Sequence, residues 1–295
     1  SAAVAGFDEF VEWERRFEST HEGRAQREFW RRKLARLGPR LKLPYDRAPP
    51  SPLISASANC DFRFSADMMD RVRALSQRTG ASTYGFMLAA YQILLTHLSG
   101  ESDVTVIATT ARRTNPRFVN TVGLITNLVG LRGLTDVRTG FANHVARAGR
   151  TVIEAMSNQD CHISVIARDL AGDALDSAST FGTADSAFDQ VGLYMMTANH
   201  SGLPDAGLRA RYDPETKFRV GQFELRGIPL RRSDCTRELT LFFNEVGREL
   251  LAFISYNADI FDAATVEAFA RKFARIAELG LDDPTRSVES IVKAL

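Results

Sequence analysis

The stretch STYGFMLAAYQILLTHLSGESDVTVIATTARR, residues 82–113, holds the two elements around which the rest of the chain is organised. Its first half is apolar on nearly every helical face, which predicts a central buried helix capped by Ser82. The apolar run 86–98 is shorter than the roughly 20 residues that a membrane span needs. The second half, from Asp103, is rich in β-branched residues and predicts a strand. Helix and strand together predict a core that mixes α and β.

The next apolar stretch, VGLITNLVGLR at 122–132, reads as a buried strand but carries Asn127, four residues after Gly123. A buried amide without partners would cost about 1–3 kcal/mol. Two interpretations follow: Asn127 satisfies local backbone groups, or it faces a ligand that uses it.

Further elements extend outward from this centre. Apolar residues at spacings of three and four predict two helices over 7–37, with a break at 21–23. A Pro-rich connector follows, then a strand around 60–64 and a helix from Ser65 to Gly80. Downstream we expect a helix over 141–156, a turn and short helix over 158–170, and a mobile loop over 171–188. The remaining expected elements are strands at 190–197, 219–229, 237–243 and 249–255 and a closing helix from Asp262 to Leu279. This order predicts an α+β sandwich with a largely antiparallel or mixed sheet.

Composition narrows the functional classes. The 295 residues are 44% hydrophobic and 25% charged, with a formal charge of +1, so neither a nucleic-acid nor a membrane partner is expected. Three dispersed cysteines indicate neither a disulfide framework nor a zinc site, and we expect a reducing, cytoplasmic environment. Phosphate-loop, dinucleotide, zincin and hydrolase-elbow motifs do not occur, and we expect no bound metal. The five histidines are isolated from one another, and each is interpreted as structural or exposed.

Several segments, in order, resemble the condensation domain of nonribosomal peptide synthetases, in the chloramphenicol-acetyltransferase-like superfamily. FDEFVEW (7–13) resembles the family's YxDYxxW, and LKLPYDRAPP (41–50) resembles its LELPTDRPRP. Residues 82–113 align almost without gaps, VGLITNLVGLR resembles IGFFVNTLVLR, and ISYNADIFDAATVEAF (254–269) resembles the closing YNTDLFDAAT segment. The likeness spans essentially the whole chain.

The resemblance implies a chloramphenicol-acetyltransferase-like fold, with crossover helices and connector at 1–52, a C-terminal lobe at 53–280 and an exit linker at 281–295. It implies an enzyme that forms an amide between a carrier-bound acyl or peptidyl thioester and a carrier-bound amino acid. The family's catalytic HHxxxDG has no counterpart in these 295 residues. We therefore expect no catalytic residue here, an absent N-terminal lobe that holds the base, and a fragment that is inactive alone. The implied partners are that lobe, donor and acceptor carrier domains and an adenylation domain. No cofactor is expected on the chain itself, because the phosphopantetheine arm belongs to the carriers.

Five residues become candidates for the substrate tunnel or for structural motifs beside it: Asn127, Gly123, Arg113, Gln159 and Asp160. Asn127 would bond a substrate amide or the pantetheine arm, or else cap a loop. Arg113 matches the family's Arg and would steady the tunnel floor by pairing with a carboxylate. Gln159 and Asp160 fall where the family has HQD, as ligands or as capping groups at a helix start.

Departures from the family leave two alternatives open. HQDxPFE becomes NQDCHIS at 158–164, and the glycine before the family's Arg becomes Arg112. These changes are compatible with a condensation-like platform that has lost catalysis and recruits a partner enzyme. A relative that uses free coenzyme A is the third interpretation.

Overall fold

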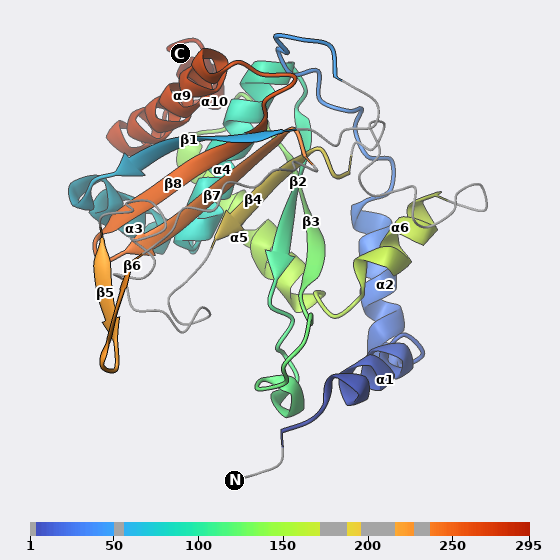
Figure 1. The fold of residues 1–295 in the computed structure, drawn as a ribbon. Coiled ribbons are helices and arrows are strands. Elements are labelled where there is room, and N and C mark those ends of the chain that lie inside the picture. Colours follow the sequence, from blue (N-terminus) through green and yellow to red (C-terminus); the bar gives the residue numbers. More distant parts are fainter. Residues whose placement is uncertain (1–3, 50–55, 172–187, 196–215, 227–236) are drawn as a thin grey trace.

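The computed structural model describes residues 4–49, 56–171, 188–195, 216–226 and 237–295 (Figure 1). Two helices lead the chain, α1 (Phe7–Phe17) and α2 (His21–Lys33). The break between them lies at 18–20, before the predicted 21–23, because the Thr20 hydroxyl accepts from the Gly23 amide at 3.0 Å and caps α2. A Cβ on Gly23 would lie 1.9 Å from the Phe17 carbonyl oxygen, so this tight turn requires glycine.

A mixed six-stranded sheet forms the centre, in the order β1-β8-β7-β4-β2-β3. Its strands are β1 (Ser57–Phe64), β2 (Asp103–Thr110), β3 (Asn127–Leu134), β4 (Val191–Met195), β7 (Leu239–Val246) and β8 (Glu249–Asn257). β4 runs parallel to both of its neighbours, and the other pairs are antiparallel. The predicted fold class, α+β with a mixed sheet and packed helices, is confirmed.

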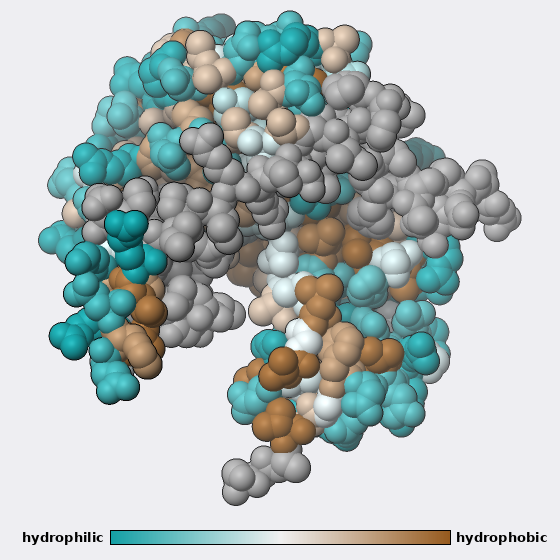
Figure 2. All heavy atoms as spheres, viewed as in Figure 1, coloured by the Kyte–Doolittle hydropathy of each residue, from teal (hydrophilic) through white to brown (hydrophobic). Residues whose placement is uncertain are grey.

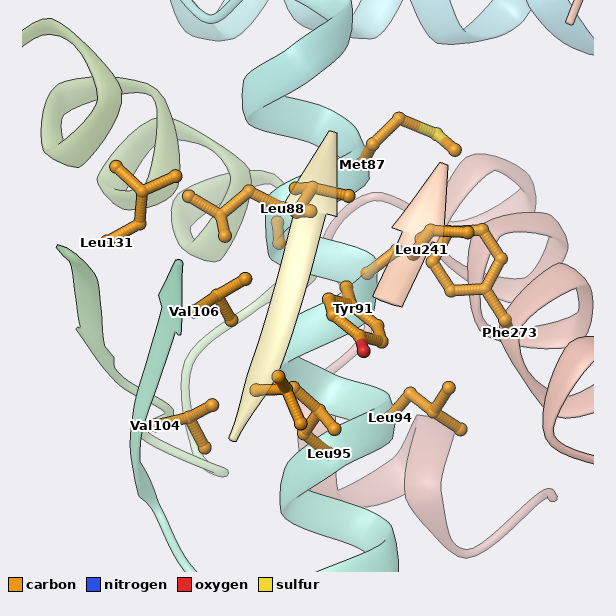
Figure 3. Packing of buried hydrophobic residues seen from close by; sticks show 14 of the residues in the cluster. Met87, Leu88, Tyr91, Leu94, Leu95, Val104, Val106, Leu131, Leu241 and Phe273 are labelled. Carbon is orange, nitrogen blue, oxygen red and sulfur yellow. The ribbon is translucent and has the colours of Figure 1, made fainter. Parts of the chain in front are cut away.

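Helices cover one face of this sheet: α3 (Ala66–Thr79), α4 (Thr83–Ser99), α5 (Phe141–Ser157) and α9 (Ala263–Asp282) (Figure 1). The predicted central helix is α4, buried from Gly85 to Thr96 and capped by Ser82. Figure 3 shows its apolar side chains between β2, β3, β7 and α9. Within the described residues, no helix combines the length and apolar character of a membrane span.

Two of the expected strands differ from the structure. β3 begins only at Asn127, so 122–126 are a loop end and not strand. The single strand expected at 219–229 is a hairpin, β5 (Lys217–Val220) and β6 (Phe223–Arg226), because Gly221 adopts φ +59° and turns the chain. The end of that range lies outside the described residues, as does most of the loop expected at 171–188.

The segment 281–295, predicted as an exit linker, packs against α9 and α4. It ends α9 and then forms α10 (Val288–Val292), whose Val288 and Ile291 are fully buried. A backbone bridge joins Ser287 to Gly140 at the start of α5. The stretch is polar and contains proline, but the two apolar side chains of this single short turn are enough to pack it against the preceding helices.

Candidate functional site

A cavity opens where two neighbouring strands of the sheet separate. β2 and β4 share a single register pair, Ile107 with Gly192, whereas β2 stays paired with β3 as far as Thr110. The hollow beyond that pair has a volume of about 870 Å³. Its described lining is Tyr84, Thr109, Thr110, Ala111, Arg112, Arg113, Thr114, Thr126, Leu128, Val152, Met156, Gln159, Tyr194, Met195, Arg237 and Phe242.

The loop between β2 and β3 is organised by Arg113. One terminal nitrogen of its guanidinium donates to the carbonyl oxygens of Phe118, Val119 and Thr121, at 2.8, 2.9 and 3.0 Å. The carboxylate partner expected for Arg113 is therefore replaced by backbone carbonyls. The residue both lines the cavity and fixes the path of this loop.

The same loop receives the first helix of the chain. Phe10 of α1 packs against Phe118 and Ile125 in an apolar cluster separate from the main core. The ring of Phe7 covers Gly123, where a Cβ would lie 2.2 Å from Phe7 Cδ2. Gly123 is thus a helix contact and does not line the cavity.

Asn127 ties the start of β3 to the turn between α5 and α6 (Ile163–Ala171). Its amide nitrogen donates to the carbonyls of Gln159 at 2.9 Å and Cys161 at 2.8 Å, and its oxygen accepts from the Ile163 amide at 3.0 Å. The side chain is 3% exposed, and both amide hydrogens are engaged. The buried amide is explained by these backbone partners.

Gln159 and Asp160 lie in the turn after α5 and not at a helix start as predicted. Gln159 lines the cavity and donates to the Met156 carbonyl at 2.8 Å. The Asp160 carboxylate accepts from the Thr114 hydroxyl at 2.9 and 3.0 Å, while its amide donates to Gln26 of α2 at 3.0 Å. Burial raises the pKa of Asp160 above its usual range.

Arg112 is the site residue that the candidate set misses. Its guanidinium is almost fully buried, pairs with Glu14 of α1, and donates to the Asp160 carbonyl at 2.6 Å. It also lies 5.4 Å from the Phe10 ring centre and 5.8 Å from that of Trp13. The backbone has φ +49°, a conformation that glycine adopts readily. The sequence signal that could have identified this residue is an arginine at a position where the family has glycine.

The described histidines lie outside the cavity lining. His21 is exposed, and His97 Nε2 lies 2.7 Å from Lys272 Nζ. His144 is buried on α5, and His162 Nδ1 lies 2.7 Å from the Ser164 hydroxyl. His200 lies outside the described residues. The described part of the wall therefore presents hydroxyl, amide and guanidinium groups but no imidazole.

Large apolar side chains are exposed at the tip of the β2–β3 loop. Val122 is 89% exposed and Leu124 is 81% exposed, beside Val119 and Phe7. Figure 2 shows apolar atoms gathered on this lower projection of the molecule. Such a concentrated apolar surface is typical of an interaction site.

Comparison with known proteins agrees with the geometry. The pattern of the Condensation domain family matches residues 2–293. The probable nonribosomal peptide synthetase CymA of Salinispora arenicola is 28% identical over 265 residues, covering 89% of this chain and 3% of its own length. Surfactin synthase subunit 1 of Bacillus subtilis is 23% identical, covering 97% of this chain and 7% of its own.

Among solved structures, the X-domain from teicoplanin biosynthesis, in complex with OxyB, superposes with a TM-score of 0.79 at 21% identity. That alignment covers 99% of this chain and 61% of the X-domain chain, so the chain spans less than two thirds of each of these proteins. The predicted resemblance and the chloramphenicol-acetyltransferase-like fold are confirmed: the chain belongs to the condensation-domain family of nonribosomal peptide synthetases.

Proposed function

We propose that this chain is the C-terminal lobe, with crossover helices at 1–52, of a condensation domain that forms an amide between two carrier-bound substrates. The amine nitrogen of one substrate attacks the thioester carbonyl carbon of the other. The carbon–sulfur bond breaks, the nitrogen loses one proton, and the released thiolate takes up a proton.

The observation that carries this proposal is the chemistry of the cavity lining. The described lining offers groups that orient a substrate but no imidazole to accept a proton. We infer that the base lies on a second lobe carrying HHxxxDG, facing this wall. Holding both thioester arms in one tunnel can itself lower the barrier by about 7–11 kcal/mol.

The exposed tip at 119–124 is the surface we assign to the second lobe. Leaving side chains such as Leu124 in water is unfavourable by about 1.5–3 kcal/mol each relative to full burial. Arg113 fixes the loop path from Phe118 to Thr121 before docking, which reduces the entropy lost on association. Carrier domains with phosphopantetheine arms and an adenylation domain complete the proposed cytoplasmic assembly.

The test uses the full-length protein and the 295-residue chain in parallel, each with loaded donor and acceptor carriers. We expect amide product, detected by mass spectrometry, from the full-length protein and none from the chain alone. Product from the chain alone would disprove the placement of the base on another lobe. An active full-length protein whose HHxxxDG second histidine can be replaced without loss would do the same.

A binding platform is the second candidate. It is favoured by the NQDCHIS departure and by the similar X-domain, which was solved in complex with OxyB. A full-length protein with a broken HHxxxDG, no amide product and stable binding of a partner enzyme would support the platform, whereas an intact HHxxxDG with amide product would support the enzyme.

A further inference from the structure

We propose that the cavity between β2 and β4 selects an aromatic side chain on a carrier-bound amino acid. This inference rests on the proposed function and adds a substrate class to it.

The first wall is a row of aromatic rings across three strands. Tyr194 on β4 lies opposite Phe242 on β7, with ring centres 5.1 Å apart. Phe242 in turn stacks on Phe253 of β8 at 4.6 Å and 16° between planes. Of these three rings, those of Tyr194 and Phe242 line the cavity, and both are partly exposed. Another ring can pack against such a surface edge-to-face or offset.

The second wall is apolar and deformable. Val152 and Met156 of α5, Met195 at the end of β4 and Leu128 of β3 all line the cavity and are partly exposed. Methionine adapts its shape, and its sulfur makes favourable contacts with aromatic rings. Rings and thioethers thus form one part of the lining, beside its hydroxyl, amide and guanidinium groups, and this apolar part suits a flat apolar group.

The charged lining excludes a cationic side chain. The charged residues among the described lining are Arg112, Arg113 and Arg237, and none of the described lining residues is a carboxylate. A bound ammonium group would therefore find no carboxylate acceptor among these lining residues.

The same three guanidinium groups already have protein acceptors. Arg237 Nε donates to Asp189 at 2.6 Å, and the guanidinium lies 5.7 Å from the Tyr194 ring centre. Arg112 is paired with Glu14, and Arg113 is held by three carbonyls. An acidic side chain would lose its hydration against the apolar part of the lining, and Arg112 and Arg237 already have carboxylate partners in the protein.

The experiment measures side-chain preference by calorimetry on the 295-residue chain. The probes are pantetheine analogues in which an amide replaces the thioester and carries phenylalanyl, alanyl, lysyl or glutamyl groups. We expect the phenylalanyl probe to bind at least ten-fold more tightly than each of the others. Equal affinities, tighter binding of the lysyl or glutamyl probe, or no binding of the phenylalanyl probe would overturn the proposal.

Two matched variants test whether the cavity lining causes the preference for the phenylalanyl probe. Phe242→Leu keeps an apolar residue on β7 and should lower phenylalanyl affinity at least five-fold. Phe223→Leu, on the exposed β5–β6 hairpin outside the cavity lining, should leave it unchanged. Unfolding curves show that both variants are folded before binding is compared. An unchanged affinity in Phe242→Leu would also overturn the proposal.

Turnover by the full-length protein separates this inference from the proposed function. Equal amide formation from alanyl and phenylalanyl acceptors and donors would refute the selective cavity and leave the enzyme intact. Selective binding without any amide product would refute the enzyme and leave the cavity intact.

Discussion

Arg112 shows how one substitution at a glycine position can join two parts of a molecule. Its left-handed backbone conformation costs about 1–2 kcal/mol for a residue with a side chain. The ion pair with Glu14 and the bond to the Asp160 carbonyl offset that cost and connect α1 to the cavity wall.

Removing this guanidinium should destabilise the chain strongly. We expect Arg112→Ala to lower the free energy of unfolding by roughly 3 kcal/mol, because it leaves buried acceptors unpaired. Arg117→Ala is the matched control, since Arg117 pairs with Glu9 of the same helix at an exposed position and should change stability by less than about 1 kcal/mol. Urea unfolding measures both, and equal effects would contradict a special role for Arg112.

Asn127 gives a second test at this scale. Asn127→Ala removes three buried hydrogen bonds and should lower the free energy of unfolding by about 2–4 kcal/mol. The exposed Asn120→Ala should change it by less than about 0.5 kcal/mol. Stability that is unchanged in Asn127→Ala would show that its contacts are dispensable and would reopen a substrate role.

His144 predicts a pH dependence. Burial, with a smaller effect from Arg147, lowers the pKa of His144 from 6.5 to about 4. The unfolded chain therefore binds a proton at a higher pH than the folded chain does. The stability that the neutral, buried His144 contributes is complete above pH 6.5 and is lost as the pH falls toward 4. The loss amounts to roughly 2–3 kcal/mol at pH 4.5. His144→Gln should remove that part of the acid dependence in unfolding curves between pH 7.5 and 4.5. The exposed His21→Gln should retain it.

At the scale of elements, much of the fold was predictable because local signals and burial agree. Ser65 and Ser82 cap helices as predicted, and Gly80 and Gly100 end them in left-handed conformations. The closing helix starts after Asp262 as predicted, although the Asp262 side chain pairs with Arg47 and makes no cap bond.

The features that the sequence did not predict have a common physical origin. The Gln159 carbonyl accepts from Asn127, and Arg113 donates to the Phe118 carbonyl. No local sequence pattern specifies either bond. The cavity opens where β2 and β4 separate, and these strands meet at Ile107 and Gly192, which are more than 80 positions apart in the chain. The resemblance to the family therefore pointed to residues of which Arg113 and Gln159 line the cavity, without giving the bonds that they make.

The helix α10 offers a test of an element. Ile291 is fully buried between α9 and α4, so Ile291→Ala should lower the free energy of unfolding by about 2–4 kcal/mol. Lys293→Ala, which removes an exposed pair with Glu289, should change it by less than about 0.5 kcal/mol. Guanidinium unfolding compares the two, and a neutral Ile291→Ala would restore the linker interpretation.

At the scale of the whole molecule, the lobe should depend on its exposed loop tip for association and not for folding. Val122→Asp combined with Leu124→Asp should abolish amide formation by the full-length protein or reduce it at least ten-fold, because charge replaces the docking surface. Thermal unfolding of the isolated chain should be nearly unchanged. Leu134→Asp, 65% exposed at the opposite end of β3, is the control and should preserve turnover. Full activity of the double variant would remove this surface from the proposed interface.

The pairing of β1 with β8 governs when the sheet can be completed. Ser57 aligns with Asn257, so this edge closes a segment of about 200 residues. Contacts so distant in sequence slow folding, since the loop entropy must be lost before the pairing is gained. On the ribosome, β1 emerges early and waits with unpaired backbone groups until β8 follows. The chain is therefore vulnerable to aggregation while it is being synthesised, and a nascent chain arrested before β8 would be a natural client for a chaperone.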